Sequence, residues 1–178
     1  MAWLVVGFGC DLAGDDGFGI SVANMVAELA KDTPKQISIE VVAKRILAPE
    51  FVENIRSADG VIFADASATL PLGIVQCTDL QALRQAELEQ ECCTTTSTGG
   101  AQMSHQCNPL TLLHLCNTLY LSSPPAWLYA VGASNFGLSE NLSSMVADLV
   151  PKVAAQIIDK IERESARASS RSSSSLKH

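Results

Sequence analysis

Short apolar runs alternate with amphipathic segments along the chain, and this alternation predicts an α/β protein. The apolar, β-branched runs predict strands at 3–6, 37–42, 61–64, 73–77 and 127–132. Segments with apolar residues at helical spacing lie between and after them, at 20–30, 47–58, 81–90, 109–119 and 142–161. We therefore expect a single-domain, three-layer α/β/α sandwich around a five-stranded, mostly parallel sheet.

Local signals define some helix ends. Asn108 followed by Pro109 is a strong helix start, because Asn caps a first turn and Pro fits the first helical position. Pro151 lies inside the last amphipathic segment and should kink or split it. Beyond residue 165 the composition turns to Ser and Arg. We expect an α/β domain over 1–165 and a disordered tail over 166–178.

A glycine-rich stretch at 7–19 joins the first predicted strand to the first helix, and it carries Asp15 and Asp16. A dinucleotide-binding loop would need a third glycine where Leu12 stands, and no phosphate-binding Gly-Lys-Ser/Thr follows. Two acids would also repel a pyrophosphate. One of the two aspartates could cap the helix, which would leave the other free to bind a cation.

Asp65 directly follows the buried run at 61–64. Ligands of open α/β sheets bind beyond the carboxyl ends of the strands, where the strand order reverses. We therefore expect Asp65 to converge with Asp15 or Asp16.

One histidine can join these carboxylates. His114 lies among leucines inside a predicted helix, so we expect a packed or partly exposed residue, and His178 lies in the tail. His105 lies in a loop just before a helix and is the better candidate. Two carboxylates and one imidazole would form a three-ligand divalent metal site with open positions, and nickel, zinc and iron all suit it.

Charge and cysteine content narrow the function classes. The net charge of −7 argues against nucleic acid and anionic membranes as partners. There is no run long enough for a membrane helix and no basic segment before the first apolar run, so we expect a cytoplasmic protein with reduced thiols. No C-x-x-C occurs among the six cysteines, and we interpret the pair Cys92-Cys93 as incidental, in a Ser/Thr/Gly-rich loop over 92–102.

The Gly-x-Gly at 7–9 followed by Gly-Asp-Asp-Gly-x-Gly at 14–19 resembles the signature of the hydrogenase maturation endopeptidases, and the resemblance extends over roughly residues 3–162. Those enzymes remove a C-terminal peptide from the large subunit of nickel–iron hydrogenases. Asp16, Asp65 and His105 match the family's acid, aspartate and histidine. The resemblance implies that they are the catalytic residues and the ligands of nickel, which arrives inside the large-subunit precursor.

The chain departs from the family pattern at two places. Cys10 stands where Asn is common, and 44–47 replaces a Gly-Thr turn. The stretch 47–50 is similar to members that serve bidirectional, NAD-linked hydrogenases.

Several alternatives remain open. The nickel could polarise the scissile carbonyl or activate a water, or Asp16 could act as a general base in an aspartic-type mechanism. A thiol mechanism would use Cys107, two residues from His105. Two other functions are a nickel-binding chaperone without peptidase activity and a nucleotide-binding protein. We expect a monomer, because no long apolar stripe is left exposed.

Overall fold

The computed structural model describes residues 1–93 and 107–174 of the 178, with the side chains of 1–86 and 107–170. Its five strands form one sheet in the order β2-β1-β3-β5-β4. They are β1 (Ala2–Phe8), β2 (Ser38–Lys44), β3 (Gly60–Ser67), β4 (Val75–Asp79) and β5 (Ala126–Gly132). Strands β2, β1, β3 and β5 run parallel to one another, and β4 runs antiparallel to β5. The predicted five-stranded, mostly parallel sheet is confirmed.

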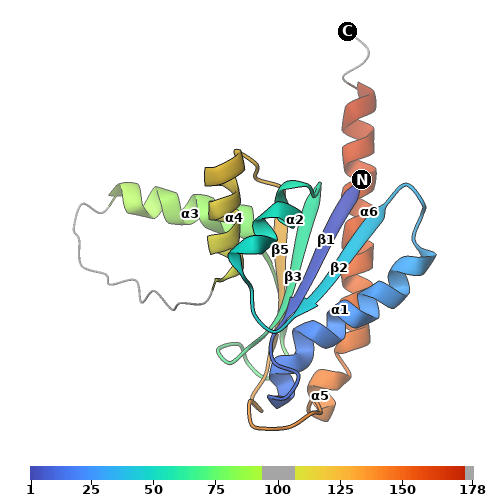
Figure 1. The fold of residues 1–178 in the computed structure, drawn as a ribbon, viewed down its shortest axis with the longest axis vertical. Helices are drawn as coiled ribbons and strands as arrows, with labels where there is room; N and C mark the ends of the chain where they lie inside the picture. Colours follow the sequence, from blue (N-terminus) through green and yellow to red (C-terminus); the bar gives the residue numbers. More distant parts are fainter. Residues whose placement is uncertain (94–106, 175–178) are drawn as a thin grey trace.

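Helices cover both faces of this sheet (Figure 1). On one face lie α1 (Phe18–Leu29) and α6 (Val150–Ser174), and on the other lie α2 (Val52–Arg56), α3 (Leu80–Cys93) and α4 (Pro109–Tyr120). The one-turn helix α5 (Ser144–Ala147) precedes α6, and short 3-10 turns occupy Gly14–Gly17, Ala30–Asp32 and Pro49–Phe51. The layers are those of the predicted three-layer sandwich.

The central strands are apolar on both sides because helices pack against both. Trp3 and Val5 belong to the core under α1 and α6, whereas Leu4 and Val6 belong to the core under α2 and α4. Successive side chains of a strand point to opposite faces, so a strand between two helix layers has to be apolar without interruption.

No described helix is long and apolar enough to cross a lipid bilayer.

Two predicted helices have different bounds in the structure. The segment predicted as one helix over 47–58 is only a 3-10 turn followed by α2, and Leu47 is buried ahead of it in extended chain. The last amphipathic segment is split as predicted, and Pro151 takes the second position of α6, where its missing N–H costs no helical hydrogen bond.

The prediction of a disordered tail from residue 166 is wrong for residues 166–174, which continue α6. Ser165 is buried, and its hydroxyl accepts a hydrogen bond of 2.9 Å from the Trp3 indole, which fixes the helix against β1. Arg167 forms an ion pair with Glu164 in this part of the helix. The Ser169 and Ser170 hydroxyls donate hydrogen bonds to the backbone carbonyls of Ser165 and Arg167. Composition alone could not show this anchor.

Cys92 and Cys93 end α3, so the prediction that they open the Ser/Thr/Gly-rich loop is wrong. Their side chains and residues 94–106, which include His105, lie outside the described part of the chain.

Replacing Ile157 with alanine is expected to lower the free energy of unfolding by about 2–5 kcal/mol, because the side chain is fully buried between α6 and the sheet. Leu149 is only partly buried, so the same change there should cost less. Urea denaturation of both variants measures the difference, with Leu138→Ala, at a side chain 96% exposed, as the control. Equal losses at all three positions would contradict the described core.

Candidate functional site

The strand order reverses at β1, because the chain next adds β2 on one side of it and then β3 on the other. The loops that leave the carboxyl ends of β1 and its neighbour therefore run to opposite sides, and a crevice is expected between them. A cavity of about 370 Å³ lies there. It is lined by Phe8, Gly9, Cys10, Asp16, Arg45, Ile46, Leu47, Asp65, Ala66 and Cys107.

Asp16 faces this cavity from the glycine-rich loop. The loop turns at Gly9, whose φ of 133° is a left-handed conformation that favours glycine. A Cβ atom at Gly9 would also lie 2.0 Å from the backbone oxygen of Asp16. The Asp16 Oδ2 atom accepts a hydrogen bond of 2.6 Å from the Cys10 backbone N–H. The tight turn therefore fixes one oxygen of this carboxylate at the cavity wall.

Asp15, the neighbouring acid, is fully buried. Its Oδ1 accepts a hydrogen bond of 2.7 Å from the Ser143 N–H, and its Oδ2 accepts one of 3.2 Å from the Asn135 N–H. Burial alone would raise the pKa of Asp15, but the hydrogen bonds from Ser143 and Asn135 hold this pKa below its ordinary value. Asp15 thus ties the glycine-rich loop to the loop after β5.

The prediction that one aspartate caps the first helix is wrong. Gly17 is the N-cap of α1, and no side chain caps it. A 3-10 turn over Gly14–Gly17 precedes the helix, so both acids lie before the capping position. The two acids still divide as expected into one structural carboxylate, Asp15, and one that faces the cavity, Asp16.

Substitution Asp15→Ala is expected to lower the free energy of unfolding by about 2–4 kcal/mol, because two buried N–H groups lose an ionised acceptor. Thermal or urea denaturation measures this loss. The exposed Asp11 in the same loop is the matched control, and Asp11→Ala should change stability by less than about 0.5 kcal/mol. A small effect at Asp15 would contradict its role as the tie between the loops.

Asp65 meets Asp16 across the cavity, as predicted. The strand is longer than predicted, so Asp65 lies within β3, opposite Ala130 of β5, rather than after the strand. Its side chain is partly buried, and Oδ1 accepts a hydrogen bond of 2.8 Å from the Ala66 N–H. Burial raises the pKa of the Asp65 carboxyl to about 7, and the charge of Asp16 adds to the rise against the opposing hydrogen bond.

The raised pKa of Asp65 predicts that stability falls as pH rises. In the unfolded chain Asp65 has its ordinary pKa of 3.8, so between pH 3.8 and about 7 the folded protein keeps a proton that the unfolded chain has lost. At about pH 8 the folded state carries the full cost of the buried charge. Asp65→Asn should then be more stable than the wild type by about 1–3 kcal/mol, and this gain should vanish near pH 3.8. Denaturation at both pH values tests it, and a gain that does not depend on pH would contradict the assignment.

The third predicted ligand cannot be placed, because His105 lies outside the described residues. His114 lies in α4, as predicted, and its side chain is exposed and does not line this cavity. Among the described side chains, those of residues 1–86 and 107–170, no group of three or more His, Cys, Asp or Glu could hold a metal ion. Asp16 and Asp65 offer two oxygen ligands at the cavity, so a metal here needs further ligands from elsewhere.

Sequence reasoning missed Arg45 as a residue of the site. Its Nη2 donates to the Cys10 Sγ at 3.0 Å, and both residues line the cavity. The parallel pairing of β1 with β2 sets Phe8 opposite Lys44 and places the two following loops side by side. Once that pairing is known, the contact between residues 10 and 45 is an expected consequence of it.

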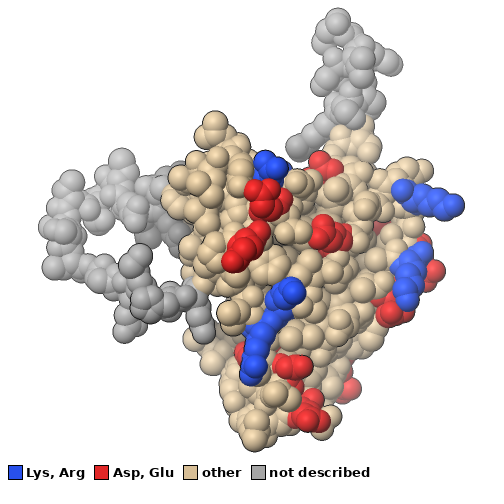
Figure 2. Space-filling view, viewed as in Figure 1, with Lys and Arg blue, Asp and Glu red and all other residues tan. Residues whose placement is uncertain are grey.

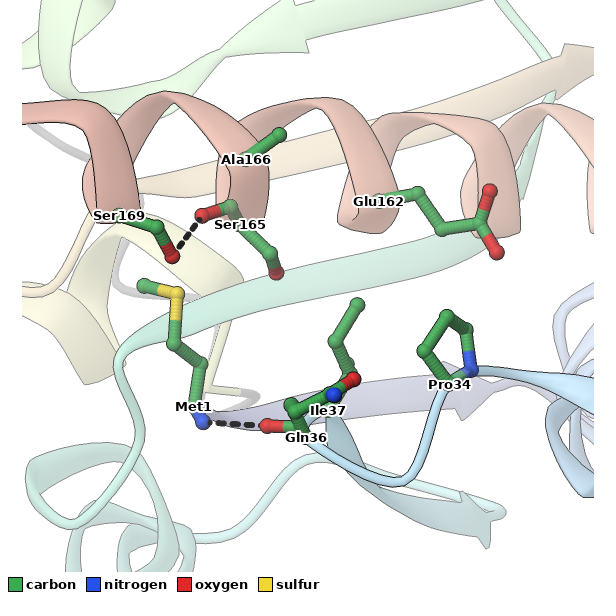
Figure 3. Close-up of a pocket in the computed structure, with 8 residues that line it drawn as sticks. All are labelled: Met1, Pro34, Gln36, Ile37, Glu162, Ser165, Ala166 and Ser169. Carbon is green, nitrogen blue, oxygen red and sulfur yellow. Dashed lines mark hydrogen bonds between the residues drawn. The ribbon is translucent and has the colours of Figure 1, made fainter.

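A second cavity of about 370 Å³ lies at the opposite, amino-terminal edge of the sheet, between α6 and the chain before β2 (Figure 3). It is lined by Met1, Pro34, Gln36, Ile37, Glu162, Ser165, Ala166 and Ser169. Glu162 is the only acid in this lining, which holds no cysteine or histidine. The paired carboxylates therefore distinguish the first cavity as the candidate site.

On the face shown in Figure 2, acidic and basic side chains are interspersed and form no continuous basic patch.

Comparisons with known proteins show the fold of the chain. No protein-family model matches the chain, and no curated protein sequence matches it. Among solved structures, the [NiFe] hydrogenase maturation protease HycI from Thermococcus kodakarensis is 19% identical, with a TM-score of 0.65 over 90% of this chain and 92% of that one. The hydrogenase maturating endopeptidase HybD from E. coli is 19% identical, with a TM-score of 0.62 over 92% of this chain and 94% of that one.

A third structure, the [NiFe] hydrogenase maturation protease HybD from Thermococcus kodakarensis, is 22% identical, with a TM-score of 0.59 over 90% of this chain and 99% of that one. In each comparison nearly the whole of both chains is matched, so the likeness covers the complete domain and not one shared motif. This chain therefore has the fold of the hydrogenase maturation proteases.

Proposed function

We propose that this protein is an endopeptidase that removes a C-terminal peptide from the nickel-loaded precursor of a nickel–iron hydrogenase large subunit. One observation carries the proposal: Asp16 and Asp65 face one cavity at the switch point of a fold shared with maturation proteases. The partner is the precursor polypeptide, and the nickel is part of that substrate. We further propose a monomer that acts in the cytoplasm on a precursor of the bidirectional, NAD-linked type.

In this proposal Asp16, Asp65 and His105 bind the nickel that the precursor carries. Carboxylate and imidazole ligands suit nickel, and three protein ligands leave positions for groups of the substrate. Before the substrate arrives, Asp65 keeps a proton up to about pH 7. A cation that binds the two carboxylates displaces this proton, so nickel converts the site into its charged form. The state of the site thus depends on whether the precursor is loaded.

The reaction is peptide hydrolysis. A water oxygen adds to the scissile carbonyl carbon, the carbon–nitrogen bond breaks, and the leaving amine takes a proton. Asp16 is one candidate base for the water, since its Oδ1 carries no hydrogen bond among the described residues whereas its Oδ2 accepts from Cys10. The nickel in the precursor is the other candidate activator, through polarisation of the carbonyl or the water.

The test is an incubation of the purified protein with nickel-loaded precursor, followed by mass spectrometry and size-exclusion chromatography. Loss of one defined C-terminal peptide supports the peptidase. If the precursor instead stayed intact in a stable complex with the protein, the function would be that of a nickel-binding chaperone and not of a peptidase. Cys107→Ala is a useful companion variant because Cys107 also lines the cavity, and it should retain activity. Its inactivation would instead indicate a thiol nucleophile.

A further inference from the structure

Arg45 brings a positive charge to a cavity whose other charged lining residues are Asp16 and Asp65. It lies in the first turn after β2, and its side chain is exposed. The hydrogen bond from the Gly9 N–H to the Lys44 carbonyl, 3.2 Å long, fixes this turn beside the glycine-rich loop. The backbone therefore holds Arg45 at the mouth of the candidate site.

The guanidinium group has spare hydrogen-bonding capacity. It carries five N–H donors, and its one polar contact with the described residues is the 3.0 Å hydrogen bond to the Cys10 Sγ. Sulfur is a weak hydrogen-bond acceptor, and this contact uses only one of the five donors. The described ion pairs do not include Arg45, so neither Asp16 nor Asp65 lies within 4.0 Å of its nitrogens.

A planar guanidinium with free donors matches a carboxylate, which it can bind through two parallel hydrogen bonds. The two cavity aspartates do not fill this role, so a carboxylate bound by Arg45 would come from outside the described chain. Resting on the proposed function, we propose that Arg45 binds a carboxylate of the precursor's C-terminal region and holds the peptide across Asp16 and Asp65.

The contact between Arg45 and Cys10 joins two loops whose sequences are particular to this chain. Cys10 and Arg45 stand at the two places where the sequence departs from the pattern of the maturation endopeptidases, and the structure shows them in contact. The Cys10 sulfur orients the guanidinium through a single donor, Nη2. The remaining donors stay free for the substrate.

The carboxylate has two possible sources. An acidic side chain beside the scissile bond is present in the uncut precursor, so its recognition contributes to substrate binding. Hydrolysis also creates a new α-carboxylate on the shortened large subunit, when the water oxygen joins the carbonyl carbon and the amine leaves. Recognition of that group contributes only to product binding.

Kinetics of Arg45→Gln distinguish these sources. We expect a rise of about 10- to 100-fold in KM if Arg45 binds a side chain of the precursor, or in the inhibition constant of the cleaved large subunit if Arg45 binds the new α-carboxylate. In either case kcat should stay within about threefold. Arg45→Lys should recover part of the loss, because it keeps the charge without the planar fork.

Two variants serve as controls. Arg163→Gln removes an exposed arginine from α6 and should leave KM and the inhibition constant unchanged. Cys10→Ala removes the thiol and should have a smaller effect than Arg45→Gln. If Arg163→Gln reproduced the full effect, the loss would reflect the overall charge of the protein and not a site at Arg45, and the proposal would be overturned.

The remaining outcomes are also decisive. Unchanged KM and unchanged product inhibition in Arg45→Gln overturn the carboxylate site and leave the proposed function standing. Failure of the wild type to cleave any loaded precursor overturns the proposed function and the carboxylate site with it.

Discussion

Asp16→Asn and Asp65→Asn are each expected to slow cleavage of nickel-loaded precursor by about 10²–10⁴-fold. An amide cannot act as a general base and is a far weaker ligand for a cation, yet it keeps nearly the same shape. Both side chains face the one cavity at the switch point of the sheet, so their loss removes the charged groups that would meet the nickel and the scissile bond. Time courses followed by mass spectrometry measure the rates.

The neighbouring acids supply matched controls for this experiment. Asp11→Asn changes an exposed acid of the same loop and should retain full activity. Asp65→Asn should combine low activity with higher stability at about pH 8, which separates a functional loss from a folding defect. Activity that survives both Asp16→Asn and Asp65→Asn would remove the carboxylate pair from the mechanism.

The second large effect is expected at Gly19, in the first turn of α1. A Cβ atom there would lie 2.3 Å from the backbone oxygens of both Ala64 and Phe8, and neither strand can move without breaking the sheet. Gly19→Ala should therefore lower the free energy of unfolding by at least about 3 kcal/mol and reduce the soluble yield. Circular dichroism and urea denaturation measure both the fold and its stability.

Gly137→Ala is the matched control. The nearest atom to a Cβ at Gly137 is the Asn135 side-chain oxygen at 3.5 Å, an ordinary contact. This variant should stay within about 0.5 kcal/mol of the wild type. If Gly19→Ala were equally well tolerated, α1 would not pack against β1 and β3 as closely as described.

The glycines of the first loop were interpreted only in part from the sequence. The lack of a third glycine at residue 12 argued against a dinucleotide site, and the structure shows that close helix–strand packing is supplied by Gly7 and Gly19 instead. A Cβ at Gly7 would lie 2.0 Å from the Gly19 backbone oxygen. The strands and their parallel arrangement could be predicted because a sheet with helices on both faces needs strands that are apolar without interruption.

Other features depended on contacts that no local pattern encodes. Asp15 and Asp16 are adjacent and chemically identical, and only the loop after β5, 120 residues away, makes Asp15 structural. The helix continues past residue 165, and the hydrogen bond that Ser165 accepts there comes from Trp3, 162 positions away. The convergence of Asp16 with Asp65 was predictable because topology alone sets it, whereas the place of His105 stays a prediction.

The most direct test of the account compares the rates at which the wild-type protein shortens nickel-loaded and nickel-free precursor under the same conditions, measured by intact-mass spectrometry. We expect that only the loaded precursor loses its C-terminal peptide, because the nickel completes the proposed site at Asp16 and Asp65. Equal cleavage of both forms would contradict recognition through nickel. Cleavage of neither would contradict the assignment of the chain as a maturation peptidase.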